Sequence, residues 1–389
     1  MYSLLLSIIY LSFISLGLPD SLLGAAWPVM RLQFGAPLHW AGGVTMIIAG
    51  GTICSSLLSE RLTRRLGTRV VTTVSVLMTA AALAGFSTAS AFWMLCLWAI
   101  PYGLGAGAVD AALNNYVALH YSSRHMSWLH SFWGVGALIS PYVMSWALRH
   151  ATWHTGYRTV SLIQFGIAAL LLLTASLWRL HKTQEEKTAQ RRAVGIRGAL
   201  RIPGVPTMLT GFFAYCSAEA ITMLWTCSYL VSVRGIAPET AAAFASLFYI
   251  GMTAGRMAAG FITDKLGDRT LIRLGGAVAM LGTVLIALPV GADLWALGGF
   301  VLVGLGCAPV YPSIIHSTPG LFGTHNSQAI IGIQMASAYT GSTFLPPLFG
   351  LVAGRFGLHL MPYVMLAFFA VMLLLIERTY RGASAQAMG

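Results

Sequence analysis

The sequence predicts an all-α integral membrane protein, with twelve transmembrane helices in two pseudo-symmetric six-helix bundles. Three observations support this fold class. Hydrophobic residues make up 57% of the 389 residues and charged residues only 9%, whereas soluble domains average about 25% charged residues. Residues 70–109 and 294–354 contain no Asp, Glu, Lys or Arg, and each stretch is long enough for two membrane-spanning helices. The third observation is an internal repeat of about 200 residues.

Apolar runs separated by charged and turn-forming residues give the twelve expected helices. The first run has no basic residues before it and continues past Gly17, so we expect a retained first helix and not a cleaved signal peptide. We expect an N-terminal bundle at 1–180, a polar cytoplasmic linker at 181–204, and a C-terminal bundle with a short cytoplasmic tail at 205–389. The expected helices are residues 3–30, 38–60, 70–89, 92–120, 126–148, 157–180, 206–233, 239–262, 271–290, 294–317, 327–354 and 357–376.

The distribution of positive charge predicts the orientation. The loops at 61–69, 121–125, 179–204 and 263–273, with the tail after residue 376, hold 17 of the 23 Lys and Arg residues. Because basic loops stay in the cytoplasm, we expect a multi-pass protein of a bacterial-type inner (plasma) membrane with both termini cytoplasmic. The net charge of +12 is divided among these loops, so it does not indicate nucleic-acid binding.

The internal repeat appears as matching residues in the two halves of the chain. The matches occur at offsets of 198 to 201 residues in four separate segments, which indicates two parallel six-helix repeats. The matching sets are Gly51 with Gly251, residues 66–69 with 266–269, residues 103–105 with 304–306, Asp20 with Glu219, and Trp27 with Trp225.

The loop after the expected helix 239–262 carries a recognisable motif. Gly260, Asp264, Lys265, Gly267 and Arg269 have the spacing GxxxDKxGxR. This pattern resembles the signature of the major facilitator superfamily, a family of secondary transporters. The glycine allows close helix packing, and the resemblance implies that the acid and its basic neighbours hold one access state closed.

The first-half copy of this motif is incomplete. Glu60 stands in place of the glycine and Arg64 in place of the aspartate, while Arg65, Gly67 and Arg69 remain. We therefore expect a gating role for these three residues, without the carboxylate contact that Asp264 provides in the second half.

Shorter matches resemble the fucose:proton symporter-like group within the superfamily. They cover residues 17–28, 103–114, 128–141 and 219–229. The resemblance implies a sugar substrate moved with protons. It also implies that acids of the first and fourth helices take part in both processes, which favours Asp20 and Asp110.

Five ionisable residues are expected at membrane depth: Asp20, Asp110, His130, Glu219 and Arg256. Each is costly to bury in hydrocarbon, so we expect them to face a protein interior or a water-filled cavity. Burial favours the neutral form of a carboxylic acid, which would allow the three acids to load and release a proton.

Asp20 follows a proline, and two interpretations of it remain open. It either caps a helix interrupted at Pro19 or binds a proton or substrate hydroxyl at a broken helix. Trp27 lies seven residues further on, which is two turns along one helix face. An acid and an indole on one face suit a sugar, whose polar edge is hydrogen-bonded while its apolar face stacks on the ring.

Asp110 and Asn114 share a helix face, and Asn115 lies beside them. They form either a buried hydrogen-bond network or part of the substrate site. Glu219 forms either an ion pair with Arg256 or a direct substrate contact. His130 is either a structural histidine or a proton relay. Further candidates for substrate binding are Trp225, Tyr229 and Gln334.

No enzyme, metal or cofactor is expected. The sequence has no HExxH, GxSxG or P-loop motif, and its five cysteines lie in apolar runs without metal-ligand spacing. We expect a monomer in the lipid bilayer that moves a small neutral polar solute, foremost a monosaccharide, with protons by alternating access. The alternatives are a proton-coupled exporter of a drug, metabolite or lipid and, more remotely, a non-transporting membrane receptor.

Overall fold

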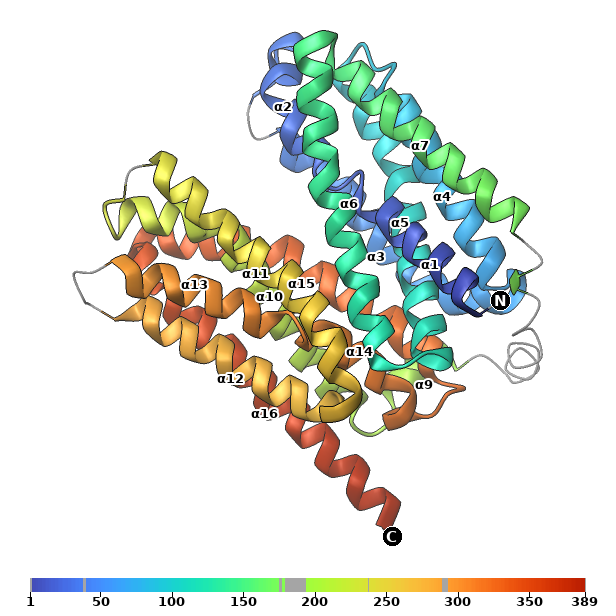
Figure 1. The fold of residues 1–389 in the computed structure, drawn as a ribbon, viewed down its shortest axis with the longest axis vertical. Helices are drawn as coiled ribbons and strands as arrows, with labels where there is room; N and C mark the ends of the chain where they lie inside the picture. Colours follow the sequence, from blue (N-terminus) through green and yellow to red (C-terminus); the bar gives the residue numbers. More distant parts are fainter. Residues whose placement is uncertain are drawn as a thin grey trace. The chain divides into compact units, whose positions relative to one another are not determined.

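The computed structural model describes residues 2–37, 40–174, 177–178, 194–236, 238–288 and 293–388. Within these ranges the regular structure is entirely helical (Figure 1), so the expected fold class is confirmed. The residues group into two compact units. Unit 1 contains residues 1–116 and 129–195, and unit 2 contains residues 117–128 and 196–389. Of the expected linker, residues 181–193 lie outside the described ranges.

Most helices begin within a few residues of the expected starts, while the last one continues to Met388 and not only to residue 376. The larger ones in the N-terminal part are α1 (Tyr2–Gly17), α2 (Leu22–Gln33), α3 (Trp40–Leu66), α4 (Thr68–Phe86), α5 (Phe92–His120), α6 (Ser123–His150) and α7 (Trp153–Leu173). After the short helix α9 (Gly195–Leu200) come α10 (Val205–Ser232), α11 (Pro238–Leu266), α12 (Asp268–Ala287), α13 (Asp293–Cys307), α14 (Val310–Phe322), α15 (Ser327–Phe356), the 3-10 turn η2 (Leu358–Leu360) and α16 (Met361–Met388).

Two of the expected helices are interrupted. The first run is divided into α1 and α2 by a turn at residues 18–21, which contains Pro19. The expected helix 294–317 is divided into α13 and α14 at residues 308–309, next to Pro309. Proline has no N–H to donate and its ring crowds the preceding turn, so both breaks occur where a helix is least able to continue.

Eight segments of the described chain have the length and apolar composition of a membrane span. The helices α6, α10, α11 and α15 lie outside this set, and they carry the polar residues His130, Glu219, Arg256 and Gln334. The eight segments are Leu4–Trp27, Trp40–Leu66, Thr68–Phe86, Phe92–His120, Trp153–Leu173, Asp268–Ala287, Leu294–Phe322 and Leu358–Ala383. The chain is therefore a multi-pass membrane protein.

The two units repeat one glycine-mediated helix contact. In unit 1, a Cβ atom on Gly103 of α5 would lie 2.2 Å from the Ile48 carbonyl oxygen of α3. In unit 2, a Cβ atom on Gly304 of α13 would lie 2.6 Å from the Phe248 carbonyl oxygen of α11. Only glycine permits such backbone approach. The sequence repeat therefore corresponds to the same packing contact in both units.

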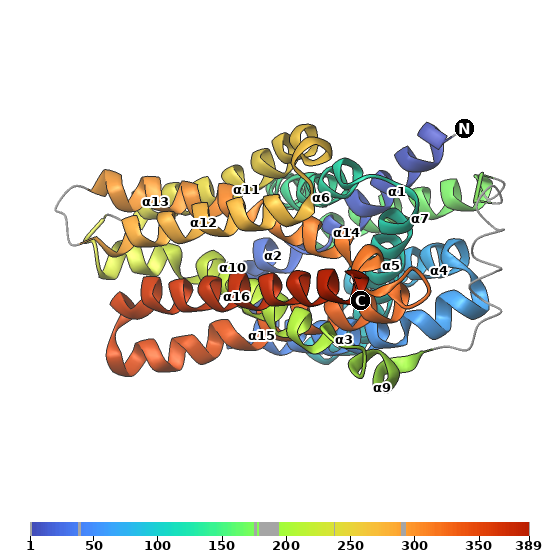
Figure 2. The ribbon, with the colours of Figure 1, turned by 90° about the horizontal axis from the view of Figure 1, so that it is seen from below.

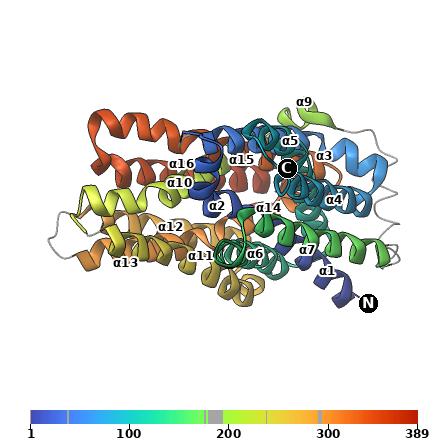
Figure 3. The ribbon, with the colours of Figure 1, turned by 90° about the horizontal axis from the view of Figure 1, so that it is seen from above.

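Each unit has its own helix packing. In unit 2, α12 contacts α13 and α16, while α10 contacts α15 and α16; Figure 2 shows these helices running side by side. In unit 1, α4 contacts α7 along much of its length (Figure 3). The apolar core of unit 1 includes Phe86, Trp153 and Tyr157, all nearly inaccessible.

Candidate functional site

Asp20 lies in the turn that separates α1 from α2, inside the first membrane-spanning segment. Its carboxylate accepts two hydrogen bonds. The Tyr102 hydroxyl of α5 donates to Oδ1 at 2.9 Å, and the Trp133 indole N–H of α6 donates to Oδ2 at 3.0 Å. Asp20 itself is exposed, whereas Tyr102 is buried. The carboxylate is therefore positioned by two aromatic donors and stays accessible to a solute.

The capping role considered for Asp20 is not seen. The residue that precedes α2 is Ser21, and its hydroxyl donates to the Ala137 carbonyl oxygen at 2.9 Å instead of capping the helix. The Asp20 carboxylate is directed to Tyr102 and Trp133.

The predicted pairing of Asp20 with Trp27 is wrong. Trp27 is only 4% exposed and packs edge-on against Phe92 in the core of unit 1, with ring centroids 6.1 Å apart. The prediction required one continuous helix from residue 20 to residue 27, but α2 begins only at Leu22. The indole beside Asp20 belongs to Trp133.

Asp110, Asn114 and His130 form a buried chain of hydrogen bonds between α5 and α6. The Asn114 amide donates to Asp110 Oδ1 at 2.8 Å, and His130 Nε2 lies 3.1 Å from Asn114 Oδ1. Because the Asn114 amide nitrogen faces Asp110, its oxygen is the acceptor and Nε2 of His130 carries the hydrogen. Asp110, Asn114, His130 and the neighbouring Asn115 are each less than 8% exposed.

This chain of hydrogen bonds joins three of the predicted site residues in one network. Of the two interpretations of Asp110 and Asn114, the arrangement corresponds to the buried hydrogen-bond network, which here joins α5 to α6. It also contains two titratable side chains, those of Asp110 and His130.

Glu219 of α10 and Arg256 of α11 approach each other in unit 2. Arg256 Nη2 lies 3.3 Å from Glu219 Oε1, and the side chains are 6% and 12% exposed for Arg256 and Glu219 respectively. The Nε atom of Arg256 is buried and has no hydrogen-bond partner among the described residues. Arg256 therefore retains a buried donor that the pair does not use.

Trp225 and Tyr229 of α10 donate hydrogen bonds to backbone carbonyl oxygens of other helices in unit 2. The Trp225 indole donates to the Pro346 carbonyl oxygen at 2.9 Å, and the Tyr229 hydroxyl donates to the Ile286 carbonyl oxygen at 3.0 Å. Gln334 is fully buried; its Oε1 accepts from Thr318 at 3.1 Å, and its Nε2 has no partner within the described chain. Of these three predicted site residues, Gln334 keeps a free polar atom.

The second-half signature motif contacts the segment 117–128. Arg124 Nη2 lies 3.0 Å from Asp264 Oδ2, and the Trp128 ring packs where a side chain on Gly260 would be, 2.3 Å from the position of its Cβ. Gly267, directly before α12, has φ of 74°, a conformation that favours glycine. Lys265 is exposed.

Arg269, the last residue of the motif, contacts Glu377 of α16 and not the segment 117–128. Its Nη2 lies 2.7 Å from Glu377 Oε1.

The first-half copy makes a different contact. Glu60 is 6% exposed, and its two carboxylate oxygens each accept a backbone N–H, from Val194 and from Gly195, at 3.0 Å. Glu60 therefore anchors the chain just before α9. Gly67 has φ of 80° and directly precedes α4, as Gly267 precedes α12. Arg65 is exposed and Arg69 half-buried.

Sequence reasoning missed Tyr102 and Trp133 as partners of Asp20. They lie 82 and 113 residues away along the chain, and no local spacing connects them. It also missed His316, whose Nδ1 lies 2.6 Å from Asp268 Oδ2 and whose Nε2 lies 3.2 Å from the Tyr121 carbonyl oxygen. In the described part of the chain, no group of three or more His, Cys, Asp or Glu residues is arranged to hold a metal ion.

Membrane-spanning helices in two repeated units, with the carboxylates of Asp20 and Asp110 inside two of the membrane-span segments, are typical of a transporter. The sequence profile of the Major Facilitator Superfamily matches residues 9–327 and 207–388. The chain belongs to this family. Its substrate is accordingly a small molecule, and it operates in the lipid bilayer.

Similar proteins agree with this assignment. Bypass of stop codon protein 6 of Saccharomyces cerevisiae is 21% identical over 408 residues, which cover 95% of this chain and 82% of the relative. Uncharacterized transporter y4wD of Sinorhizobium fredii is 26% identical, over 80% of this chain and 81% of the relative.

Solved structures show the same fold. The transporter FucP in the outward conformation has a TM-score of 0.77 and 15% identity, with 96% of this chain and 98% of that chain covered. The proton:xylose symporter XylE has a TM-score of 0.78 and 11% identity, with 97% and 94% covered. A bacterial homologue of the iron transporter ferroportin has a TM-score of 0.76 and 14% identity, with 97% of this chain and 98% of that chain covered. The fold is thus common to proteins with different cargoes.

Proposed function

We propose that this protein is a secondary active transporter that moves a small neutral polar solute of the monosaccharide class together with protons, by alternating access. One observation carries the proposal. The exposed Asp20 carboxylate lies at a helix break within the first membrane span and is oriented by Tyr102 and Trp133. A carboxylate beside an indole and a phenol supplies both the acceptor and the aromatic surface that a sugar requires.

The charge of the membrane-embedded groups supports a neutral substrate. In unit 2, Glu219 and Arg256 lie 3.3 Å apart and offset each other's charge. In unit 1 the carboxylate of Asp20 is held by two neutral donors, Tyr102 and Trp133. An anionic substrate would approach the Asp20 carboxylate, and the two groups that hold this carboxylate carry no positive charge.

The same acids supply the proton part of the proposal. Asp20 is the substrate-linked proton site, because it is the accessible carboxylate. Asp110 is buried in the network that joins it through Asn114 to His130, so its protonation is coupled to the α5–α6 contact. Glu219 is the corresponding acid in unit 2. The relatives XylE and FucP, a proton:xylose symporter and a fucose:proton symporter by their descriptions, are consistent with this class.

We further propose that the protein is a monomer in a bacterial-type inner membrane with both termini in the cytoplasm, since the basic loops favour that orientation. The two six-helix bundles at 1–180 and 205–389, joined by the linker 181–204, are the moving parts in this proposal.

A thermal-shift screen of the purified protein tests the substrate class. Monosaccharides, nucleosides, amino acids and cationic drugs are compared, since a ligand that binds the folded state raises its stability. We expect stabilisation by a monosaccharide in the wild type and loss of that shift in Trp133→Ala. Stabilisation by cationic drugs alone would contradict the proposal and favour the exporter alternative.

A further inference from the structure

An open groove runs between α12 and α16 near the start of α12 and the C-terminal part of α16. It has a volume of about 510 Å³ and is lined by Arg273, Leu373, Leu374, Glu377, Arg378 and Arg381. None of these residues takes part in the site around Asp20 or in the Glu219–Arg256 pair. The groove lies in the last membrane span of the chain, where its apolar run meets basic residues.

The apolar wall of the groove results from close packing of α12 against α16. A Cβ atom on Gly276 of α12 would lie 2.5 Å from Leu373 Cδ2 of α16, so the absence of a side chain at this position admits Leu373. The next residue, Leu374, is 70% exposed. An exposed leucine next to this contact provides an apolar surface directed away from the helix bundle.

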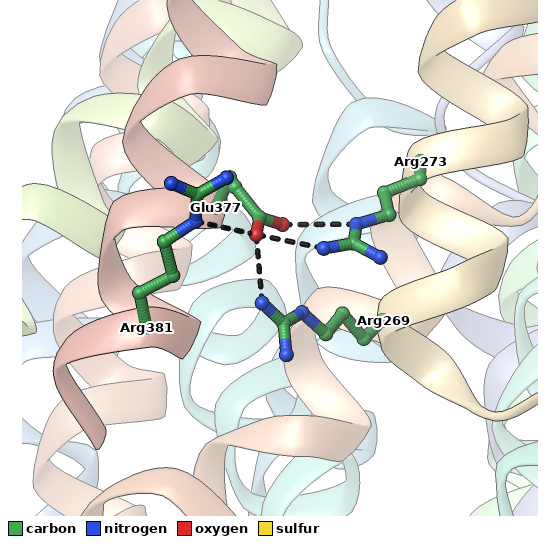
Figure 4. A network of polar contacts seen from close by, with 4 residues as sticks. All are labelled: Arg269, Arg273, Glu377 and Arg381. Carbon is green, nitrogen blue, oxygen red and sulfur yellow. Dashed lines mark hydrogen bonds and ion pairs between the residues drawn. The ribbon is translucent and has the colours of Figure 1, made fainter. Parts of the chain in front are cut away.

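The basic wall carries more positive charge than its acid neutralises. Glu377 accepts hydrogen bonds from Arg269 Nη2 at 2.7 Å, from Arg273 Nε at 2.9 Å and Nη2 at 2.7 Å, and from Arg381 Nε at 3.0 Å (Figure 4). Arg378 is exposed and has no acidic partner among the described residues. The three arginines and one glutamate that line the groove leave a formal excess of two positive charges, and Arg269 adds a third beside Glu377.

The free donors of this cluster are accessible. The side chains of Arg273 and Arg381 are 53% and 76% exposed, respectively. A guanidinium group has five N–H donors, so each arginine that contacts Glu377 keeps donors for a second acceptor. The planar fork of arginine is well suited to phosphate oxygens.

We propose that this groove binds one anionic phospholipid. The phosphate contacts Arg273, Arg378 and Arg381, and an acyl chain lies along Leu373 and Leu374. Basic pockets between transmembrane helices attract anionic headgroups from the adjoining leaflet. The juxtaposition of an exposed apolar wall and an excess of positive charge in one groove favours a lipid over a free phosphate, because a free phosphate makes no use of the leucines.

Native mass spectrometry of the full chain in mild detergent tests this proposal, with phosphatidylglycerol and phosphatidylcholine added at equal concentrations. We expect one phosphatidylglycerol to remain bound to the wild type in preference to phosphatidylcholine. The variant Arg378→Gln/Arg381→Gln should bind it about 10- to 30-fold more weakly, because each basic residue near an anionic lipid contributes a several-fold gain. Arg378→Gln alone, which breaks no contact within the described chain, should lose part of that affinity.

A matched control removes two exposed arginines elsewhere. Arg149→Gln/Arg355→Gln lowers the net charge equally on the expected opposite side of the membrane, and it should retain the lipid. Equal loss in both double variants would overturn the proposal, because binding would then follow overall charge.

Two further arms separate a lipid from a free phosphate. Leu374→Ser should weaken phosphatidylglycerol binding while all charges are kept. Glycerol 3-phosphate, which has the headgroup chemistry without acyl chains, should fail to compete at equal concentration. Full competition by glycerol 3-phosphate, or unchanged lipid binding in Leu374→Ser, would contradict the lipid assignment.

Discussion

At the scale of single residues, Asp20 combines two properties that a coupling acid needs. It is accessible, and its orientation is held by Tyr102 and Trp133. Asp110 shares the acid chemistry but is buried in a network with Asn114 and His130. The two acids of unit 1 therefore have different environments, and substitution at each should have a distinguishable result.

Substitution of Asp20 by asparagine removes the titratable group and nearly preserves the shape. We expect Asp20→Asn to fold and to exchange substrate across the membrane, while proton-driven accumulation is lost. Uptake into proteoliposomes under an imposed proton gradient, compared with counterflow without a gradient, measures the two activities. Accumulation equal to that of the wild type would show that Asp20 is not the coupling acid.

For Asp110→Asn we also expect loss of proton-driven accumulation, together with a lower melting temperature, because the new amide faces the amide of Asn114. The double variant Asp110→Asn/Asn114→Asp is the matched control for the network, because it exchanges the acid and the amide and so restores an acid next to the substituted position. Wild-type accumulation by Asp110→Asn would remove Asp110 from the proton pathway and leave it a structural role.

Substitutions in the Glu219–Arg256 pair test whether the two charges stabilise each other. With side chains 12% and 6% exposed, removal of either charge leaves the other uncompensated, at an expected cost of about 3–5 kcal/mol for a fully buried pair. We expect Glu219→Gln and Arg256→Gln each to lower the melting temperature strongly, and the double variant to recover most of the loss. Strictly additive losses would show that the two residues act independently.

At the scale of helices, the first turn of α6 is tied to the end of α11. Asp264 contacts Arg124, Gly260 makes room for Trp128, and the Trp128 indole donates to the Met257 carbonyl oxygen at 3.3 Å. The corresponding place in the first half has Arg64, while Glu60 holds the backbone before α9. The two halves therefore use their signature regions differently.

This asymmetry predicts an unequal effect of neutral substitutions. We expect Asp264→Asn to weaken the α6–α11 contact and shift the protein toward the inward-open state, whereas Arg64→Asn has little effect. A reporter cysteine at the inner mouth, in a background without the native cysteines, is labelled from the cytoplasmic side to measure the shift. Equal labelling rates in Asp264→Asn and the wild type would mean that this contact is not the latch.

The glycine contacts give a stability test of the repeat. A methyl group on Gly103 would lie 2.2 Å from the Ile48 carbonyl oxygen. A methyl group on Gly50 would have no neighbouring atom of the described chain within 4 Å. We expect Gly103→Ala to destabilise the protein by about 1–3 kcal/mol through overpacking. Gly50→Ala, which adds the same methyl group in open space, should leave the melting temperature unchanged or higher. Similar melting temperatures for the two variants would contradict the close α3–α5 approach.

At the scale of the whole molecule, composition and charge patterning were sufficient to predict the fold class and where most helices begin, but not the two interruptions or the continuation of α16 to Met388. Charge-free stretches and basic loops are properties of the chain that do not depend on tertiary contacts. The interruption after Gly17 was indicated by Pro19, but the exact break was not, and this error misplaced Trp27. Helical spacing holds only while the helix is continuous.

The candidate site was predictable only in part. Asp20, Asp110, Glu219 and Arg256 are recognisable because a charge in an apolar run is costly. Their partners are not, since Trp133 reaches Asp20 from 113 residues away and the approach depends on the packing of α6. Glu377 illustrates the same limit. It lies just beyond the last expected helix, and its three arginine contacts arise from the packing and continuation of α16.

Coupling of solute movement to protons is the property that distinguishes the proposed symporter from a facilitator. Proteoliposomes that contain the purified protein, a pH electrode in a weakly buffered medium, and a monosaccharide identified by the thermal-shift screen measure this coupling directly. We expect addition of the sugar to make the medium more alkaline as protons enter with it, in the wild type but not in Asp20→Asn. Sugar uptake by the wild type without any pH change, and unaffected by a protonophore, would contradict the account.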